Sequence, residues 1–306
     1  MEDKYYKFST YLKERFGTRV HKVSVDANFS CPNLDGKIST KGCIYCNNEA
    51  FSFHTRMGKL LSLEEQITAG IEAIKKRFKA KKFIVYFQAY TNTYAGIDVL
   101  KKKYDVIKKF KDVVGLSIAT RPDCINEESL NLIESYKANY EVWLEYGLQS
   151  IHNKTLKFIN RGHTFEDFLK AVKITRKHKL KICAHIIIGL PYETKDMILK
   201  TAKAMGNLKI EGIKIHPLHI IKETALEELF KQGKYTPLEF NNYLDLLVDF
   251  LTYLWPKTVI QRVSAYCPPE FLVAPAWILE RNKVEGELEK RLVEKNYFQG
   301  KLYQKD

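Results

Sequence analysis

The stretch VWLEYG at residues 142–147 and the stretch KICAHIII at residues 181–188 are two short apolar runs that enclose a helical pattern. Thr164 is a good N-cap residue for that helix, and Asp167 follows in its first turn. One face of the helix then carries Phe168, Ala171, Val172 and Thr175. A strand, a helix and a second strand in this order predict two parallel strands joined by a crossover helix.

The same unit recurs along the chain. Ser62 and Glu65 form a capping box that starts another helix, whose inner face carries Ile67, Ile71, Ile74 and Phe78. With the two runs above, the predicted strands number six, the others being residues 22–27, 83–88, 114–119 and 212–216. These units predict an α/β fold, a partial (β/α)6 TIM-like barrel whose active site lies at the carboxyl ends of the strands.

No Gly-, Ser- or Pro-rich linker divides these units. We therefore expect one barrel domain over residues 1–255 and a short C-terminal extension over residues 256–306 that packs on it. The start of the chain is charged where a signal peptide would be apolar, and no segment has the roughly 18 apolar residues of a membrane span. The expected location is the cytoplasm.

The composition is that of a folded, basic protein. Of 306 residues 45% are apolar, and 50 Lys and Arg against 36 Asp and Glu leave a net charge of +14. Such an excess attracts polyanions such as RNA, although Lys-rich helices that form solvated outer faces would produce the same count. Six cysteines in a reducing compartment indicate metal ligation or burial rather than disulfides.

Three cysteines follow the first predicted strand, in the segments CPNLDG (residues 31–36) and GCIYCNN (residues 42–48). Cys43 and Cys46 alone could form a redox pair, or half of a zinc site with His54 as a fourth ligand. Together with Cys31 they could instead hold three irons of a cubane cluster, which leaves the fourth iron open for a cofactor or substrate. The spacing alone leaves these three possibilities open.

Five later motifs follow predicted strands or precede a helix: ATRPD (119–123), EYGLQS (145–150), NRGH (160–163), HIIIGLP (185–191) and KIHPL (214–218). Together with the cysteines, over about residues 20–270, they resemble the radical S-adenosylmethionine (SAM) superfamily, in the branch of the Elongator catalytic subunit and the oxygen-independent coproporphyrinogen oxidases. The gap of eleven residues after Cys31 departs from the common gap of three, but Elongator-like members also have a long one.

The resemblance implies two cofactors, a 4Fe–4S cluster on Cys31, Cys43 and Cys46 and SAM on its open iron. Reductive cleavage of SAM then yields a deoxyadenosyl radical, which is the chemistry that the cofactors supply. A flavodoxin or a ferredoxin would be the electron donor. Cys124, Cys183 and Cys267 form no second ligand set and are expected to be small buried side chains.

The resemblance also assigns the residues around SAM. Arg161 would bind the methionine carboxylate with its guanidinium fork, unless it is a surface residue at the entry of a helix. The amino group would be bound by Gln88, Thr91 and Asn92, in a segment that departs from the usual Gly-Gly-Glu-Pro pattern. Gln149 and His185 would contact the ribose, and Gly189 and Pro191 would let the backbone approach the adenine. Tyr45, Glu145 and Leu218 are expected on the cofactor side of the site. Several also have plain structural interpretations: His185 as a satisfied core residue, Gly189 and Pro191 as a turn, and Glu145 as a buried partner of Arg121.

The substrate is suggested by the segments IIKETAL (220–226), FKQGKY (230–235), QRVSAYCPPE (261–270) and APAW (274–277). They resemble Elongator subunits and a small bacterial family linked to tRNA wobble-uridine modification, in which a carboxymethylaminomethyl group is trimmed to aminomethyl. The partner would be tRNA, with Lys214, Lys222 and Arg262 near enough to the mouth to reach phosphates. Two alternatives remain: a radical SAM enzyme for a tetrapyrrole or amino acid, and a zinc-stabilised RNA-binding module.

Overall fold

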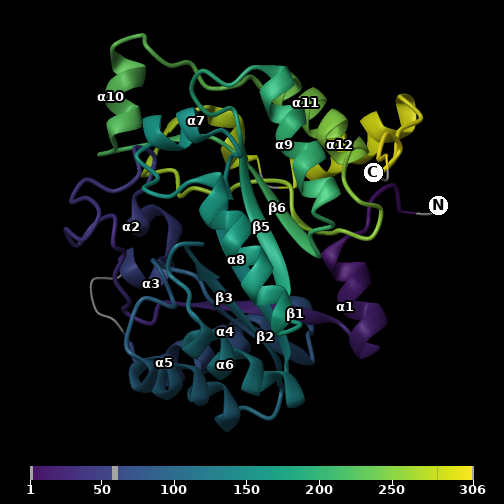
Figure 1. Cartoon of the computed structure of the whole chain (residues 1–306). Coiled ribbons are helices and arrows are strands. Elements are labelled where there is room, and N and C mark those ends of the chain that lie inside the picture. Colours follow the sequence, from purple (N-terminus) through teal and green to yellow (C-terminus); the bar gives the residue numbers. More distant parts are fainter. Residues whose placement is uncertain (1–2, 57–60, 281, 305–306) are drawn as a thin grey trace.

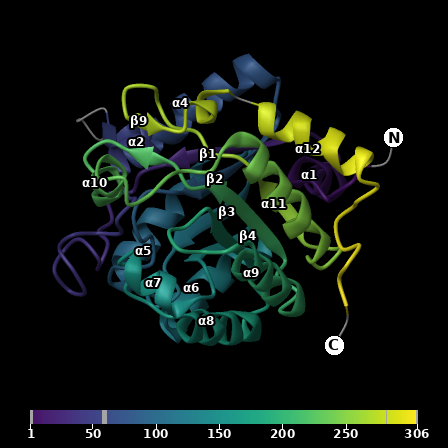
Figure 2. The ribbon, with the colours of Figure 1, turned by 90° about the horizontal axis from the view of Figure 1, so that it is seen from above.

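The computed structural model describes residues 3–56, 61–280 and 282–304. Its centre is a curved sheet of seven parallel strands in the order β1-β2-β3-β4-β5-β6-β8 (Figures 1 and 2). The strands are β1 (Val20–Val25), β2 (Lys82–Phe87), β3 (Val113–Thr120), β4 (Glu141–Gln149), β5 (Lys181–Ile188), β6 (Gly212–Pro217) and β8 (Val259–Arg262). The partial barrel and all six predicted strands are confirmed.

Helices cover the outer face of the sheet, because the strands are apolar on both faces and must be buried on both. The capping boxes predicted at Ser62 and Thr164 are both formed. The outer helices are α4 (Leu63–Phe78), α5 (Ile97–Tyr104), α6 (Glu127–Ser135), α8 (Phe165–Lys177), α9 (Lys195–Asn207) and α11 (Phe240–Thr252). Among the described residues no helix is long and apolar enough to cross a membrane.

The seventh strand, β8, was not predicted. It is only four residues long, and it extends the sheet by pairing Val259 with Gly212 and Arg262 with Lys214. Its outer edge is covered by the N-terminal segment, where the Ile260 amide donates to the Tyr6 carbonyl at 2.8 Å. Such a short strand has no recognisable sequence pattern, because contacts with the neighbouring β6 and the N-terminal segment hold it in the sheet.

The remaining elements lie around the ends of the barrel. A second, two-stranded antiparallel sheet joins β7 (Ile220–Ile221) to β9 (Leu272–Ala274). The short helices are α1 (Phe8–Phe16), α2 (Asn48–Phe51), α3 (Phe53–Arg56), α7 (Asn153–Phe158), α10 (Ala225–Lys231), α12 (Lys283–Glu294), and the 3-10 turns η1 (Asp105–Lys109), η2 (Tyr136–Ala138) and η3 (Ala276–Leu279). The cysteine segment, α7 and α10 gather at the carboxyl ends of the strands (Figure 1).

Candidate active site

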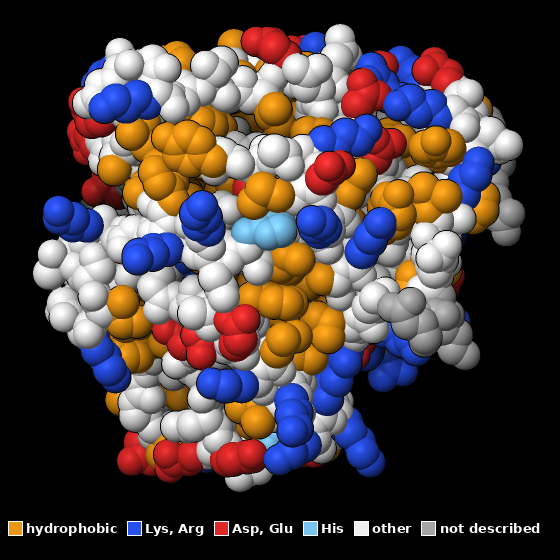
Figure 3. Space-filling model, turned by 45° about the horizontal axis from the view of Figure 1, so that its top comes forward, with side chains coloured by type: hydrophobic (Ala, Val, Ile, Leu, Met, Phe, Trp, Pro, Cys, Tyr) orange, Lys and Arg blue, Asp and Glu red, His pale blue; other side chains and the backbone are white. Residues whose placement is uncertain are grey.

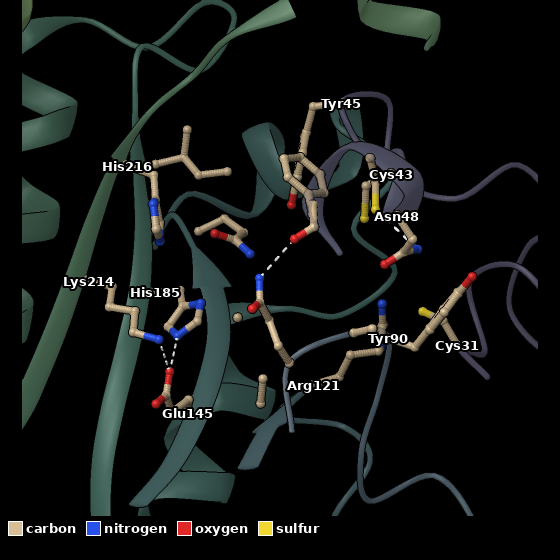
Figure 4. Close-up of a pocket in the computed structure, with 18 of the residues that line it drawn as sticks. Cys31, Cys43, Tyr45, Asn48, Tyr90, Arg121, Glu145, His185, Lys214 and His216 are labelled. Atoms are coloured by element: carbon tan, nitrogen blue, oxygen red, sulfur yellow. Dashed lines mark hydrogen bonds and ion pairs between the residues drawn. The ribbon is translucent and has the colours of Figure 1, made fainter. Parts of the chain in front are cut away.

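A cavity of about 420 Å³ opens at the carboxyl ends of the strands. Residues in or directly after the strands β2 to β6 and β8 line it, together with the cysteine segment between β1 and α2. Figure 4 shows the two sides of this cavity: Cys31, Cys43 and Tyr45 on one side, and Glu145, His185, Lys214 and His216 on the other. The predicted position of the active site is therefore where the chain forms a cavity.

Cys31, Cys43 and Cys46 all line the cavity. The chain turns at each of them, because the Leu34 amide donates to the Cys31 carbonyl at 2.8 Å and the Cys46 amide to the Cys43 carbonyl at 3.0 Å. The intervening Ile44 is held by two distant segments: its amide donates to Ile159 at 3.1 Å, and its carbonyl accepts from Leu226 at 2.8 Å. Tertiary contacts thus bring the three thiols to one place despite the long first gap.

The sulfur atoms have hydrogen-bond donors around them. Asn33 Nδ2 and Arg161 Nη1 lie 3.5 and 3.6 Å from Cys43 Sγ, and Asn48 Nδ2 lies 3.9 Å from Cys46 Sγ. Burial and the neighbouring thiols of Cys43 and Cys31 raise the pKa of Cys46 to about 12. Cys43 is buried and Cys31 and Cys46 are partly buried, so three thiolates at this place need a strong cation beside them, which is what an iron–sulfur cluster provides.

His54 was the candidate fourth ligand of a zinc site. It lies in α3 and is not among the residues that line the cavity beside the cysteines. All six cysteines are free of disulfides. Cys183 and Cys267 are buried as expected, whereas Cys124 is only partly buried, so that part of the expectation was wrong.

Arg161 lies beside the cysteines and is 8% exposed, so it is not a surface residue. Its Nε and Nη2 atoms donate to the carbonyl of Gly147 at 3.0 and 2.6 Å, while Nη1 approaches Cys43. A side chain at position 147 would displace this arrangement, because a Cβ there would lie 2.6 Å from Arg161 Nη2. Gly147 is therefore required for the close approach of the guanidinium to the backbone of β4.

In the segment after β2, some of the predicted ligand side chains point into the cavity and one points away from it. Gln88 and Thr91 line the cavity, and Gln88 is steadied by a 3.1 Å hydrogen bond from its Nε2 to the Phe51 carbonyl. Asn92 does not line the cavity; it is fully buried, and its Nδ2 donates to the carbonyls of Phe87, Ala89 and Ala119. The structure thus brings two of the three predicted amino-group ligands to the site.

Of the remaining predicted cofactor residues, some line the cavity and others do not. Tyr45, Gln149, His185 and Leu218 line the cavity, whereas Gly189 and Pro191 are not among its lining residues. Gly189 has a φ of +95° and its carbonyl accepts from the Tyr235 hydroxyl at 2.8 Å. These contacts give Gly189 the structural role of a turn that a side chain could not adopt without strain.

Glu145 is completely buried below the cavity and does not pair with Arg121. Arg121 instead forms a fork with Asp123, with both distances 2.9 Å, and donates to the Arg161 carbonyl at 2.8 Å. The Glu145 carboxylate accepts from Lys22 at 2.5 Å, from His185 Nε2 at 2.8 Å, and also from Lys214 and Ser117. These cations and hydrogen bonds overcome the effect of burial and hold the pKa of Glu145 well below its usual value.

Lys22 also donates to Gln261 Oε1 at 2.7 Å, which connects the two edge strands β1 and β8. One polar layer therefore joins six of the seven strands, through Lys22, Ser117, Glu145, His185, Lys214 and Gln261. We name these six residues the polar layer. The only signal for it in the sequence is a charged residue inside an apolar strand, as at Lys22 and Lys214.

The structure corrects the prediction for Lys214. It is 5% exposed and paired with Glu145, so it lies inside the barrel and cannot reach the phosphates of a bound nucleic acid. Lys222 and Arg262 are exposed, and Arg262 lines the cavity. Sequence reasoning missed His216 and His219 as cavity residues, although both lie in or next to the KIHPL motif.

Comparison with known families agrees with this geometry. The model of the radical SAM superfamily matches residues 36–205, and that of the radical SAM C-terminal domain matches residues 210–294. The chain belongs to the radical SAM superfamily. It is a radical SAM enzyme, and its cofactors are a 4Fe–4S cluster and SAM, as the motifs had indicated.

Relatives of this radical SAM enzyme include YtqA of Bacillus subtilis, which is 36% identical over 304 residues, 99% of this chain and 94% of YtqA. A tRNA uridine(34) acetyltransferase of Methanocaldococcus jannaschii is 31% identical over 164 residues, 52% of this chain and 30% of that enzyme. The structure of Elp3 from Methanocaldococcus infernus superposes with a TM-score of 0.68 at 20% identity, over 92% of this chain and 64% of Elp3. That similarity shows a shared fold.

Proposed function

We propose that this radical SAM enzyme modifies the wobble uridine of tRNA and trims a carboxymethylaminomethyl group to aminomethyl. The observation that carries the proposal is the similarity to tRNA uridine(34) acetyltransferases, which spans 164 residues of the chain. The site adds a cavity between the cysteines and a cationic wall, which suits a side chain that carries a carboxylate. The enzyme would work in the cytoplasm, with a flavodoxin or ferredoxin as electron donor.

The cluster ligands in this proposal are Cys31, Cys43 and Cys46. The hydrogen bonds that Asn33, Arg161 and Asn48 direct at the sulfurs support it, because such contacts orient metal-bound thiolates and spread their charge. When bound, the cluster and SAM supply the radical that removes a hydrogen atom from the substrate. The chain itself binds, orients and shields the reacting groups.

Arg161 would hold the methionine carboxylate of SAM. Its side chain is already fixed by the Gly147 carbonyl, so little conformational entropy is lost when the remaining N–H groups bind a carboxylate. Gln88 and Thr91 would bind the amino group. His185 donates its Nε2–H to Glu145, which leaves Nδ1 as an acceptor for a ribose hydroxyl of the cofactor.

The charged surface supports a tRNA partner. Figure 3 brings the top of the view in Figure 1 forward, and Lys and Arg side chains are spread across the middle of this face. Lys222, between β7 and α10, is an exposed cation close to the mouth. Phosphates of the anticodon arm would contact such side chains while the modified base enters the cavity.

The proposal is tested by nucleoside analysis of tRNA from a strain that lacks the gene. We expect the carboxymethylaminomethyl nucleoside to accumulate and the aminomethyl nucleoside to disappear, with recovery on complementation. Unchanged wobble nucleosides would refute the tRNA substrate and favour a small-molecule one. Iron and sulfide content with an absorbance band near about 400 nm separates both from a zinc-stabilised RNA-binding module.

A further inference from the structure

The wall of the cavity that faces the cysteines carries more cations than carboxylates. Among the described residues that line the cavity, Glu145 alone is acidic. Its two oxygens already accept from Lys22, Lys214, His185 and Ser117. Two lysines therefore share one carboxylate that has no capacity left for a ligand, and burial lowers the pKa of Lys214 to about 7.

Arg262 adds a positive charge to this wall. It ends β8 directly opposite Lys214 of β6, and it is exposed and lines the cavity. Its guanidinium has no ion pair or hydrogen bond to any residue that the structure describes. A cation with its five donors free at the edge of a cavity is available for an anionic ligand.

His216 lies on the same wall, above His185 and Lys214 in Figure 4. Its ring centroid is 5.7 Å from that of His185, and its ring nitrogens have no hydrogen-bond partner among the described residues. The charge of Arg262 is among the causes that lower the pKa of His216, after burial and the neighbouring His185, so the two side chains are close enough to interact. A neutral imidazole there can donate one hydrogen bond to an acceptor.

We propose that Arg262 and His216 form a subsite for a carboxylate of the substrate. A guanidinium fork matches a carboxylate with two parallel hydrogen bonds, and the positive charge of Arg262 attracts the anion to this wall. A carboxylate on this wall would leave an adjacent methylene between the wall and the cysteine side, where the radical is formed. That the carboxylate belongs to the wobble side chain rests on the proposed function; the anion subsite does not.

A backbone phosphate of RNA is the other anion that Arg262 could bind. The position of the subsite favours a carboxylate, since Arg262 is exposed but His216 lies inside the cavity on β6, and the cavity also has to hold SAM. A side chain on a base can extend to that depth. A backbone phosphate could reach this position only if the sugar–phosphate chain entered the barrel as well.

The test uses two small probes with the reconstituted, SAM-loaded full-length enzyme: N-benzylglycine, a carboxylate, and N-benzylglycinamide, its neutral amide. Titration calorimetry or ligand-observed NMR should show that the enzyme prefers the carboxylate by at least about tenfold. Arg262→Gln should abolish the preference, Arg262→Lys should keep part of it, and His216→Phe should reduce it. Arg77→Gln, on the outer helix α4, is the matched control and should leave it unchanged.

Equal binding of the two probes, or no measurable binding of either, would overturn the proposal, as would an unchanged preference in Arg262→Gln. Inorganic phosphate that displaces N-benzylglycine at equal concentration would assign the subsite to a phosphate instead. Circular dichroism of each variant shows whether it is folded. The probes contain no RNA, so a deletion strain with normal tRNA would refute the proposed substrate and leave this result standing.

Discussion

Arg161 contacts the cysteine segment and β4 at the same time, so it connects that segment to the sheet. Arg161→Lys keeps the charge but cannot hold the Gly147 carbonyl and face a carboxylate together. We expect its affinity for SAM to fall about tenfold or more, roughly 1.4 kcal/mol, in an equilibrium titration. Gly147→Ala should act in the same way through displacement of Arg161, whereas Gly96→Ala, with open space around its Cβ, should not.

The three cavity cysteines should differ from the others in iron content. Ala in place of Cys31, Cys43 or Cys46 is expected to remove the cluster and with it the cleavage of SAM, because each replacement deletes one of three thiolate ligands. Cys124→Ala is the matched control, since that thiol is partly exposed and outside the cavity lining. Iron and sulfide are measured after anaerobic purification. A full complement of iron in Cys43→Ala would disprove the ligand assignment.

His185 gives the stability of the protein a pH dependence. Burial, and then the charge of Lys214, lowers the pKa of His185 to about 4 from an ordinary 6.5. Between these values the unfolded chain binds the extra proton and the folded chain does not, so the free energy of unfolding falls as pH drops from about 6.5 to about 4. Urea unfolding of the apoprotein should show this slope, and His185→Gln should reduce it, while His163 and His216, whose pKa values are also lowered by burial, maintain the rest. An identical slope in the variant would mean that other groups cause it.

In a complete barrel, backbone hydrogen bonds join the first strand to the last. In this partial barrel, side chains of the polar layer join the two edge strands. Lys22 on β1 and Gln261 on β8 connect the edge strands through side chains, and Glu145 at the centre balances the lysines on both sides. Glu145, His185 and Lys214 of this layer also line the cavity. The same residues therefore stabilise the barrel and determine the charge that a substrate meets.

The layer predicts a large cost for the loss of its one carboxylate. Glu145→Gln leaves the buried Lys214 and the partly buried Lys22 without a counter-charge, and we expect the free energy of unfolding to fall by about 3–5 kcal/mol. Glu128→Gln, on the exposed side of α6, should change it by less than about 0.5 kcal/mol. Both follow from urea unfolding curves. A small effect of Glu145→Gln would mean that the lysines find solvent or lose their protons at little cost.

The net charge of +14 on the whole molecule should strengthen the binding of tRNA through contacts with its phosphates. If Lys222 contacts a phosphate, Lys222→Ala should reduce the slope of log affinity against log salt by about one unit. Lys76 on the outer helix α4 is equally exposed but far along the barrel from the mouth, and Lys76→Ala should leave the slope unchanged. Filter binding of precursor tRNA over a range of salt measures both. Equal slopes for all three proteins would remove Lys222 from the interface.

Much of the barrel could be predicted because its signals are local. Apolar runs and capping boxes, as at Ser62 and Thr164, depend on residues a few positions apart, and a strand–helix–strand order restricts the topology. The strand β8 could not, because four residues carry no period of their own. It is a strand only because β6 and the N-terminal segment lie on either side of it.

The cofactors could be predicted from the sequence because five later motifs, among them NRGH, add a family resemblance to the cysteines; the cysteine spacing alone left a redox pair and a zinc site open. The use of each side chain could not, because direction and pairing depend on residues far away in the chain. Asn92 was expected to bind SAM and Lys214 a phosphate of tRNA, but Asn92 is held by buried hydrogen bonds and Lys214 by an ion pair with Glu145. Arg262 and His216 line the cavity and have no such partner among the described residues. Sequence identifies which groups are present; only the tertiary structure determines which of them are already satisfied by the protein and which remain free for a substrate.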